Sequence, residues 1–248
     1  KEDEAGGVME GTLALVLGVT ALIGSIKITK EVLTVNWTMT MASSILLFYV
    51  AQDGVISSVE GILFVSILLA YLLLLFIRSR KNIEKEENQE IVNPIFTTTS
   101  WVKDIAFFAG GLMLLSYGSK FLVESASELA KMMEVSERII AIVVIAVGTS
   151  LPELFTSIIA AIKKDTDLAL GNLLGSNIFN ILSILGITSI IQDIHIAAPF
   201  QTEDMYWVLG ITAILLPMMF IGKKISRVDG FVLFCLYAAY IALVIIDA

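Results

Sequence analysis

Residues 148–162 read Gly-Thr-Ser-Leu-Pro-Glu-Leu-Phe-Thr-Ser-Ile-Ile-Ala-Ala-Ile and end an apolar run that spans residues 139–162. Glu153 stands inside this run, where an ionisable side chain is costly to bury and therefore marks a candidate functional site. Pro152 has no N–H and cannot bond to the carbonyl of Gly148, so the helix is predicted to kink or break here. A broken helix at membrane depth is tolerated where its freed backbone is buried in protein or lines a wet cavity. The stretch therefore predicts a polar site inside a bundle of membrane-spanning helices.

Hydroxyl side chains surround Glu153 at helical spacing. Thr149 and Ser150 precede it by four and three residues, and Ser157 follows it by four. In a continuous helix this spacing places all four side chains on one face. Carboxylate, hydroxyl and freed carbonyl oxygens are the donors that hard cations such as Ca²⁺ prefer. The face is therefore a candidate cation site.

A second polar ladder follows in residues 171–180, which read Gly-Asn-Leu-Leu-Gly-Ser-Asn-Ile-Phe-Asn. Asn172, Ser176 and Asn180 recur every four residues, and the two glycines beside them allow a close approach of another helix. We expect this ladder to face Glu153 and to add amide and hydroxyl oxygens to the cation site. The alternative is a polar contact that only holds two helices together.

The bulk composition indicates an all-α polytopic membrane protein. Of the 248 residues, 57% are hydrophobic, and the mean hydropathy is +0.88. About eight apolar segments approach or reach the roughly 20 residues that span a bilayer as a helix. They lie near 7–26, 32–50, 56–77, 101–123, 136–162, 168–191, 205–222 and 229–246. We find no nucleotide-binding motif and no Ser/His/Asp set, so the sequence does not indicate an enzyme or a bound cofactor. The net charge of −8 lies mainly in loops and does not indicate a nucleic-acid partner.

A charged linker, residues 78–90, separates the third and fourth apolar segments and is predicted to be a solvated loop. When this linker is placed in the cytoplasm, most of the 16 Lys and Arg residues lie on the same side. The opposite side keeps only Lys1, Lys120, Lys131 and Arg138. This asymmetry agrees with the positive-inside rule. We therefore expect an integral protein of the plasma (inner) membrane with residues 78–100 in the cytoplasm.

The chain also contains an internal repeat. Residues 17–23, Leu-Gly-Val-Thr-Ala-Leu-Ile, resemble residues 185–191, Leu-Gly-Ile-Thr-Ser-Ile-Ile. Residues 56–61, Ile-Ser-Ser-Val-Glu-Gly, resemble residues 225–230, Ile-Ser-Arg-Val-Asp-Gly, at nearly the same offset. The first and sixth helices must run in opposite directions, because an odd number of crossings separates them. Inverted repeats with broken helices are typical of secondary transporters, which bind their substrate at the repeat interface.

The two polar stretches, 148–157 and 167–180, resemble the second α-repeat of the cation/calcium exchanger superfamily, and the resemblance spans roughly residues 105–191. It implies a sodium/calcium exchanger membrane region with ten helices in two inverted repeats of five. It also implies a secondary active antiporter that exchanges Ca²⁺ for Na⁺ by alternating access. K⁺-dependent exchange and Ca²⁺/H⁺ exchange are the variants left open. The ligands expected for the transported cation are Glu153, Thr149, Ser150, Ser176 and Asn180.

The resemblance further predicts how the chain is divided. Residues 1–79 are expected to be the remainder of the first repeat, 80–100 a cytoplasmic linker, and 101–248 the complete second repeat. The chain would then be an N-terminally incomplete form of the ten-helix antiporter, with helices 1 and 2 supplied by the full-length chain.

The first repeat departs from the family pattern. Thr12 stands where the repeat would place the counterpart of Asn180, and Val8 replaces that of Ser176. A single carboxylate also leaves a bound Ca²⁺ with uncompensated charge. The alternative function is therefore a non-transporting, degenerate membrane subunit, or one that depends on a partner.

Overall fold

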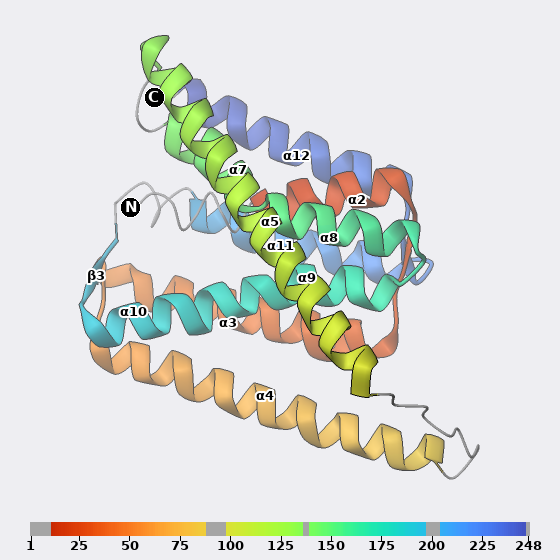
Figure 1. Cartoon of the computed structure of the whole chain (residues 1–248). Coiled ribbons are helices and arrows are strands. Elements are labelled where there is room, and N and C mark those ends of the chain that lie inside the picture. Colours follow the sequence, from red (N-terminus) through yellow and green to blue (C-terminus); the bar gives the residue numbers. More distant parts are fainter. Residues whose placement is uncertain (1–10, 88–97, 136–138, 197–203, 247–248) are drawn as a thin grey trace.

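The computed structural model describes residues 11–87, 98–135, 139–196 and 204–246, which are mainly helical (Figure 1). The elements of the first half are η1 (Gly11–Val16), α2 (Leu17–Ile23), β1 (Ile26–Lys27), η2 (Val32–Trp37), α3 (Thr38–Val50), η3 (Ala51–Asp53), β2 (Val55–Ile56) and α4 (Ser58–Glu87). The second half contains α5 (Thr98–Met132), η4 (Ile140–Ile145), α7 (Ala146–Thr149), α8 (Leu151–Ile162), α9 (Thr166–Phe179), η5 (Asn180–Leu185), α10 (Gly186–Ile191), β3 (Ile194–His195), α11 (Met205–Phe220), β4 (Lys224–Ile225) and α12 (Arg227–Ile246). Each of the eight predicted apolar segments is mainly helical over its described part.

The charged linker differs from the prediction. Helix α4 continues to Glu87, so a solvated loop is wrong for residues 78–87. The stretch contains neither Gly nor Pro and is rich in Lys, Arg and Glu, which favour helices. Arg80 and Glu84 also stand four residues apart with opposite charges, which supports a helix. The division of the chain at residues 80–100 stays a prediction.

Two short β-ladders join the first half of the chain to the second. Strand β1 pairs antiparallel with β4, through Ile26 with Ile225 and Lys27 with Lys224. Strand β2 pairs antiparallel with β3, through Val55 with His195 and Ile56 with Ile194. The helical segment η2–α3–η3 connects β1 to β2, so the two ladders lie at opposite ends of the bundle (Figure 1). Helix α2 ends at the first ladder and α10 at the second, which confirms that the first and sixth helical segments run in opposite directions.

Contacts between the halves and within each half occur in mirrored pairs. Helix α2 packs against α12, and its repeat counterpart α10 packs against α4, the counterpart of α12. The hydroxyl of Tyr71 donates to Oδ1 of Asn36 at 3.3 Å. Tyr240 and Asp204, at the corresponding positions, form the same bond at 3.1 Å. The described parts of residues 7–79 and 175–248 are therefore related by an approximate two-fold axis, as the sequence repeat predicted.

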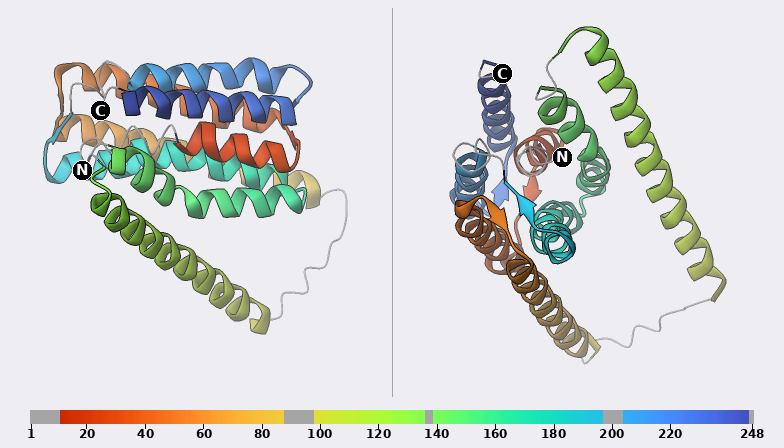
Figure 2. Two further views of the ribbon diagram at one scale, coloured as in Figure 1. Left: turned by 90° about the horizontal axis from the view of Figure 1, so that it is seen from above. Right: turned by 90° about the vertical axis from the view of Figure 1, so that its left-hand side faces the viewer.

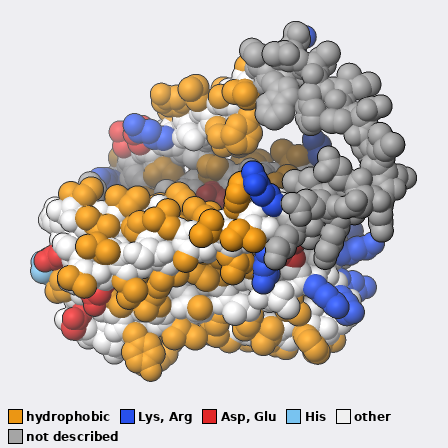
Figure 3. All heavy atoms as spheres, turned by 90° about the horizontal axis from the view of Figure 1, so that it is seen from below, with side chains coloured by type: hydrophobic (Ala, Val, Ile, Leu, Met, Phe, Trp, Pro, Cys, Tyr) orange, Lys and Arg blue, Asp and Glu red, His pale blue; other side chains and the backbone are white. Residues whose placement is uncertain are grey.

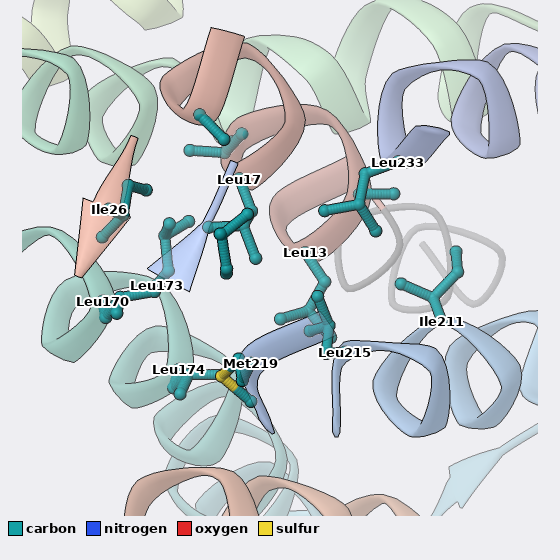
Figure 4. Packing of buried hydrophobic residues seen from close by; sticks show 14 of the residues in the cluster. Leu13, Leu17, Ile26, Leu170, Leu173, Leu174, Ile211, Leu215, Met219 and Leu233 are labelled. Atoms are coloured by element: carbon teal, nitrogen blue, oxygen red, sulfur yellow. The ribbon is translucent and has the colours of Figure 1, made fainter. Parts of the chain in front are cut away.

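The interior of the bundle is filled by aliphatic side chains from both halves (Figure 4). Leu13 and Leu17 of the first half pack with Leu173 of α9, Leu215 of α11 and Leu233 of α12, and each is at most 1% exposed. Between membrane helices this close packing, rather than a hydrophobic driving force, stabilises association. The core therefore fixes α9 against the elements of the first half.

The exterior of the bundle is also apolar. Hydrophobic side chains cover much of the face shown in Figure 3. Four described helical segments are long and apolar enough to cross a membrane: Val32–Asp53, Ser58–Arg80, Lys103–Met132 and Thr166–Ile191. Shorter apolar helices are Leu13–Ile23, Leu151–Ile162 and Met205–Phe220. An apolar exterior around an apolar core is the pattern of a bundle that faces lipid.

Helix α5 stands apart from the parallel helices of the bundle. It runs at a steep angle to them, and its N-terminal end lies away from the bundle whereas its C-terminal end lies beside it (Figures 1 and 2). Its main contacts among the described residues are with η4, α7 and α8. Because these are the elements that contain the predicted helix break, α5 packs directly against the region of the candidate site.

Candidate cation site

The predicted break in the fifth apolar segment is confirmed. Helix α7 ends at Thr149 and α8 begins at Leu151, with Ser150 between them at φ −85° and ψ −2°. Pro152 occupies the first turn of α8. Since it cannot donate to the carbonyl of Gly148, the main-chain hydrogen bond that would continue one helix through this point is missing. The break releases backbone oxygens in the middle of an apolar segment.

The carboxyl group of Glu153 lies just after the break, in the first turn of α8. The side chain is half-buried, and its Oε2 atom is buried without a hydrogen-bond partner among the described residues. A helix N-terminus favours a nearby negative charge, because the first N–H groups point towards it. A buried carboxylate oxygen that no protein donor satisfies is available to bind a cation.

The break also separates two of the predicted ligands. Thr149 is exposed at the end of α7, whereas Ser150 is 2% exposed. The prediction that Thr149, Ser150, Glu153 and Ser157 share one helical face assumed a continuous helix. Thr149 and Ser150 differ in exposure at the break, and a face shared by all four side chains stays a prediction.

Helices α8 and α9 form an antiparallel pair that places the second polar ladder beside the first. The turn between them contains Lys164 at φ +61°, and the Asp165 side chain caps α9 by accepting a hydrogen bond from the Leu168 N–H. The Asn172 side-chain Nδ2 donates to the Glu153 carbonyl oxygen at 3.3 Å and to Ser157 Oγ at 3.2 Å. Asn172 therefore joins the two polar stretches directly.

The remaining residues of the ladder follow in the next turns of α9. Ser176 is half-buried, and its hydroxyl donates to the Leu173 carbonyl at 3.0 Å. Asn180 is half-buried and begins the π-helical segment η5. Such segments are frequent at functional sites. Among the described residues no hydrogen bond joins Glu153 to Asn180, so their common cavity stays a prediction.

Asn177 is a site candidate that the sequence analysis missed. Its Nδ2 donates to the Leu173 carbonyl at 2.9 Å. Its Oδ1 is fully buried and has no partner in the described part of the chain. Its position in the polar run 175–180 could have indicated a role in the site, but Asn177 falls outside the four-residue spacing of the ladder. A buried amide oxygen without a donor is a second acceptor available in this region of α9.

The first half of the chain also reaches this region. Segment η1, the repeat counterpart of η5, packs against α7, α8 and α9. Thr12 belongs to η1, whereas Val8 lies outside the described residues. Within the described residues, no three His, Cys, Asp or Glu side chains gather to form a metal centre. The candidate site that these elements define thus includes the Glu153 carboxylate and polar groups of α8 and α9.

A two-fold-related bundle of apolar helices, with a buried carboxylate at a helix break, is typical of secondary transporters that move cations. The chain belongs to the sodium/calcium exchanger protein family, which matches residues 103–246. It is therefore a helical integral membrane protein of a transporter family rather than a member of an enzyme family.

Several known proteins are similar to the chain. CaxA of Alkalimonas amylolytica, provisionally named as an antiporter, is 33% identical over 236 residues, which cover 92% of this chain and 73% of CaxA. The sodium/calcium exchanger MaX1 of Methanosarcina acetivorans is 34% identical over 144 residues, which cover 57% of this chain and 40% of MaX1. A structure of the sodium-calcium exchanger NCX_Mj, soaked with 10 mM Na⁺ and no Ca²⁺, superposes with a TM-score of 0.76 at 26% identity. That superposition covers 96% of this chain and 75% of NCX_Mj.

Proposed function

We propose that the protein is a secondary active antiporter that exchanges Ca²⁺ for Na⁺ by alternating access. The observation that carries the proposal is the buried, unpartnered Oε2 of Glu153 at the break between α7 and α8. Membership of the sodium/calcium exchanger protein family supports this choice of cations. K⁺-dependent exchange and exchange for H⁺ are the two variants that the experiment below separates.

The proposed ligands divide between the two helices. Glu153 supplies the carboxylate, and Ser150 and Thr149 supply hydroxyl or backbone oxygens from the broken helix. Ser176 adds a hydroxyl oxygen and Asn180 an amide oxygen from α9 and η5. These are the hard oxygen donors that Ca²⁺ and Na⁺ prefer. The exposure of Thr149 favours its backbone oxygen, or a position at the entrance of the site, over a buried hydroxyl ligand.

The proposed orientation follows from the charges at the two ends of the bundle. The ladder β1–β4 contains Lys27 and Lys224. The end of α8 lies beside this ladder, as the approach of Gly24 to Ala161 shows. The turn after α8 adds two more lysines. On the positive-inside rule this end faces the cytoplasm. The plasma (inner) membrane and a cytoplasmic position for residues 78–100 belong to the same proposal.

A second function class is supported by a separate observation. The described residues contain no group of three or more acidic, His or Cys side chains, and Thr12 occupies the repeat position of Asn180. A degenerate subunit that binds no Ca²⁺, or that acts only with a partner, would have this composition. It predicts no exchange activity in the isolated full-length gene product.

Counter-transport in sealed vesicles tests both classes. The full-length gene product should move Ca²⁺ against an imposed Na⁺ gradient, and separate K⁺ and H⁺ gradients identify the coupled ion. Glu153→Gln keeps the shape of the side chain and removes its charge, so it should abolish Ca²⁺ movement without unfolding the helices. Thr156→Val, on the same helix, removes a hydroxyl that donates to the Pro152 carbonyl at 2.8 Å, and should retain transport. Transport at the wild-type rate by Glu153→Gln would show that Glu153 is a structural residue.

A further inference from the structure

The side-chain amide of Asn172 on α9 connects the two polar stretches of the candidate site by hydrogen bonds to α8. Its Nδ2 donates to the backbone carbonyl of Glu153 at 3.3 Å and to Ser157 Oγ at 3.2 Å, two acceptors one helical turn apart on α8. Ser157 is fully buried, and its hydroxyl lies 3.5 Å from the Ala169 carbonyl on α9. The amide therefore spans α8 and α9 with both of its N–H groups.

The start of α8 is held by the packing of Leu154 against the buried core, and Asn172 adds a polar restraint on its backbone. The helix ladder is interrupted before Leu151, because Pro152 cannot donate to the preceding turn. The Glu153 Oε2 atom has no donor in the described part of the chain, so no hydrogen bond to that oxygen fixes the side chain. The location of the carboxylate is consequently set by the backbone of its helical turn. The hydrogen bond from Asn172 to the Glu153 carbonyl restrains that backbone.

Asn172 also has a fixed relation to the ligands proposed on α9. Ser176 lies one helical turn after Asn172 on the same face of α9. The hydrogen bond from Asn172 to the Glu153 carbonyl therefore also affects the distance between Glu153 and Ser176. The core packing of Leu170, Leu173 and Leu174, each at most 1% exposed, holds α9 against the rest of the bundle. Helix α9 is held by this core packing, and the Asn172 hydrogen bonds restrain the first turns of α8 against it.

We propose that Asn172 is a positioning residue, which holds the first turn of α8 against α9 and thereby sets the size of the cation cavity between Glu153 and Ser176. The inference rests on the proposed function. Selection between cations of the same charge depends on cavity size, ligand number and ligand flexibility. Loss of the Asn172 bonds loosens the cavity while leaving the proposed ligands in place. Ca²⁺ should then lose its advantage over the larger Sr²⁺.

The experiment compares wild type with Asn172→Ala and Asn172→Leu in the full-length protein. The leucine variant keeps the branching of the asparagine side chain, although its methyl groups make it larger, and it has no N–H to donate. Initial rates of exchange are measured against external Ca²⁺ and against external Sr²⁺. Residues that position metal ligands typically contribute about 10- to 100-fold to metal affinity. We therefore expect apparent Ca²⁺ affinity to fall by about 10- to 100-fold, with a smaller loss for Sr²⁺.

Two further measurements separate positioning from a general structural role. Thr156→Val is the matched control, because it removes one side-chain hydrogen bond on α8 without affecting α9. It should leave the ratio of Sr²⁺ to Ca²⁺ affinity unchanged. Hydrogen–deuterium exchange of amides in the first turns of α8, including Leu154, should increase in both Asn172 variants and not in the control. This measurement does not depend on transport activity.

The outcomes distinguish the two proposals. An unchanged Sr²⁺ to Ca²⁺ ratio in either folded Asn172 variant overturns the positioning role, and so does unchanged amide exchange in α8. Absence of Ca²⁺ transport by the wild-type protein instead overturns the proposed function. Amide exchange then decides separately whether Asn172 restrains α8.

Discussion

Helix α4 crosses α10 at Gly61, and this crossing leaves no space for a side chain. A Cβ atom on Gly61 would lie 2.6 Å from the Gly186 carbonyl oxygen, 3.0 Å from Ile190 Cγ1, and closer still to Ser189 Oγ. The Ser189 hydroxyl is fully buried and donates to the same Gly186 carbonyl at 3.1 Å, so it cannot easily move aside. Gly61→Ala therefore requires α4 and α10 to separate.

The expected cost follows from two opposing effects. Overpacking of a close-packed contact costs about 1–3 kcal/mol, and a backbone obstruction places this site near the upper end. Replacement of glycine by alanine in a helix returns at most about 1 kcal/mol. The net loss of stability is then about 2 kcal/mol. For a chain of this size the unfolding temperature falls by about 2–4 °C for each kcal/mol, which gives a decrease of about 4–8 °C.

Thermal unfolding of the detergent-purified protein measures this decrease. Gly210→Ala is the control, because a Cβ atom on Gly210 in α11 meets no atom within 4 Å. It should unfold at or slightly above the wild-type temperature. At the mirrored crossing of α2 and α12, a Cβ atom on Gly230 would lie 2.8 Å from the Gly18 carbonyl oxygen, so Gly230→Ala should resemble Gly61→Ala. The reasoning is refuted if Gly61→Ala unfolds no earlier than Gly210→Ala.

Two other substitutions give separate tests. Glu134 follows α5 at φ +57°, and the Val135 N–H bonds to the Ala130 carbonyl, a helix-ending turn that favours glycine. Glu134→Gly should therefore stabilise the protein by about 1 kcal/mol in the same unfolding assay, and a lower unfolding temperature would contradict this. Asn180→Asp adds a carboxylate to the proposed site and should strengthen Ca²⁺ binding by about tenfold at neutral pH, because ligand charge tunes affinity. Unchanged or weaker Ca²⁺ binding, measured by calorimetry against wild type, would count against Asn180 as a ligand.

Much of the architecture could be predicted because its determinants are local. A run of apolar residues long enough to cross a bilayer has few structural options other than a helix. Pro152 changes the backbone at its own position, so the break before Leu151 could be located to within a residue or two. The failure at residues 78–87 has a related cause. Charge was taken as a sign of a loop, whereas Lys, Arg and Glu also favour an exposed helix.

The site could be predicted less completely, because its geometry depends on contacts between helices. The four-residue spacing located Asn172 on α9, but it gave no indication that the amide bonds to the Glu153 backbone. Asn177 was missed because burial of its Oδ1 arises from the packing of α9, which a ladder pattern does not record. The two β-ladders were also unpredicted. Each consists of two-residue strands from distant parts of the chain, and so short a strand has no pattern of its own.

The approximate two-fold symmetry allows structural hydrogen bonds at mirrored positions to be compared with the candidate cation site. Tyr71 bonds to the amide of Asn36, whereas Tyr240 bonds to the carboxylate of Asp204 at the mirrored position. An acceptor oxygen is sufficient for this hydrogen bond, because it forms both with the neutral Asn36 and with the acidic Asp204. At Glu153 the requirement differs, since its buried Oε2 has no protein donor among the described residues and a neutral amide could not balance the charge of a cation. Isosteric exchange of acid for amide should therefore preserve the fold at Glu153 and abolish only the proposed binding of Ca²⁺.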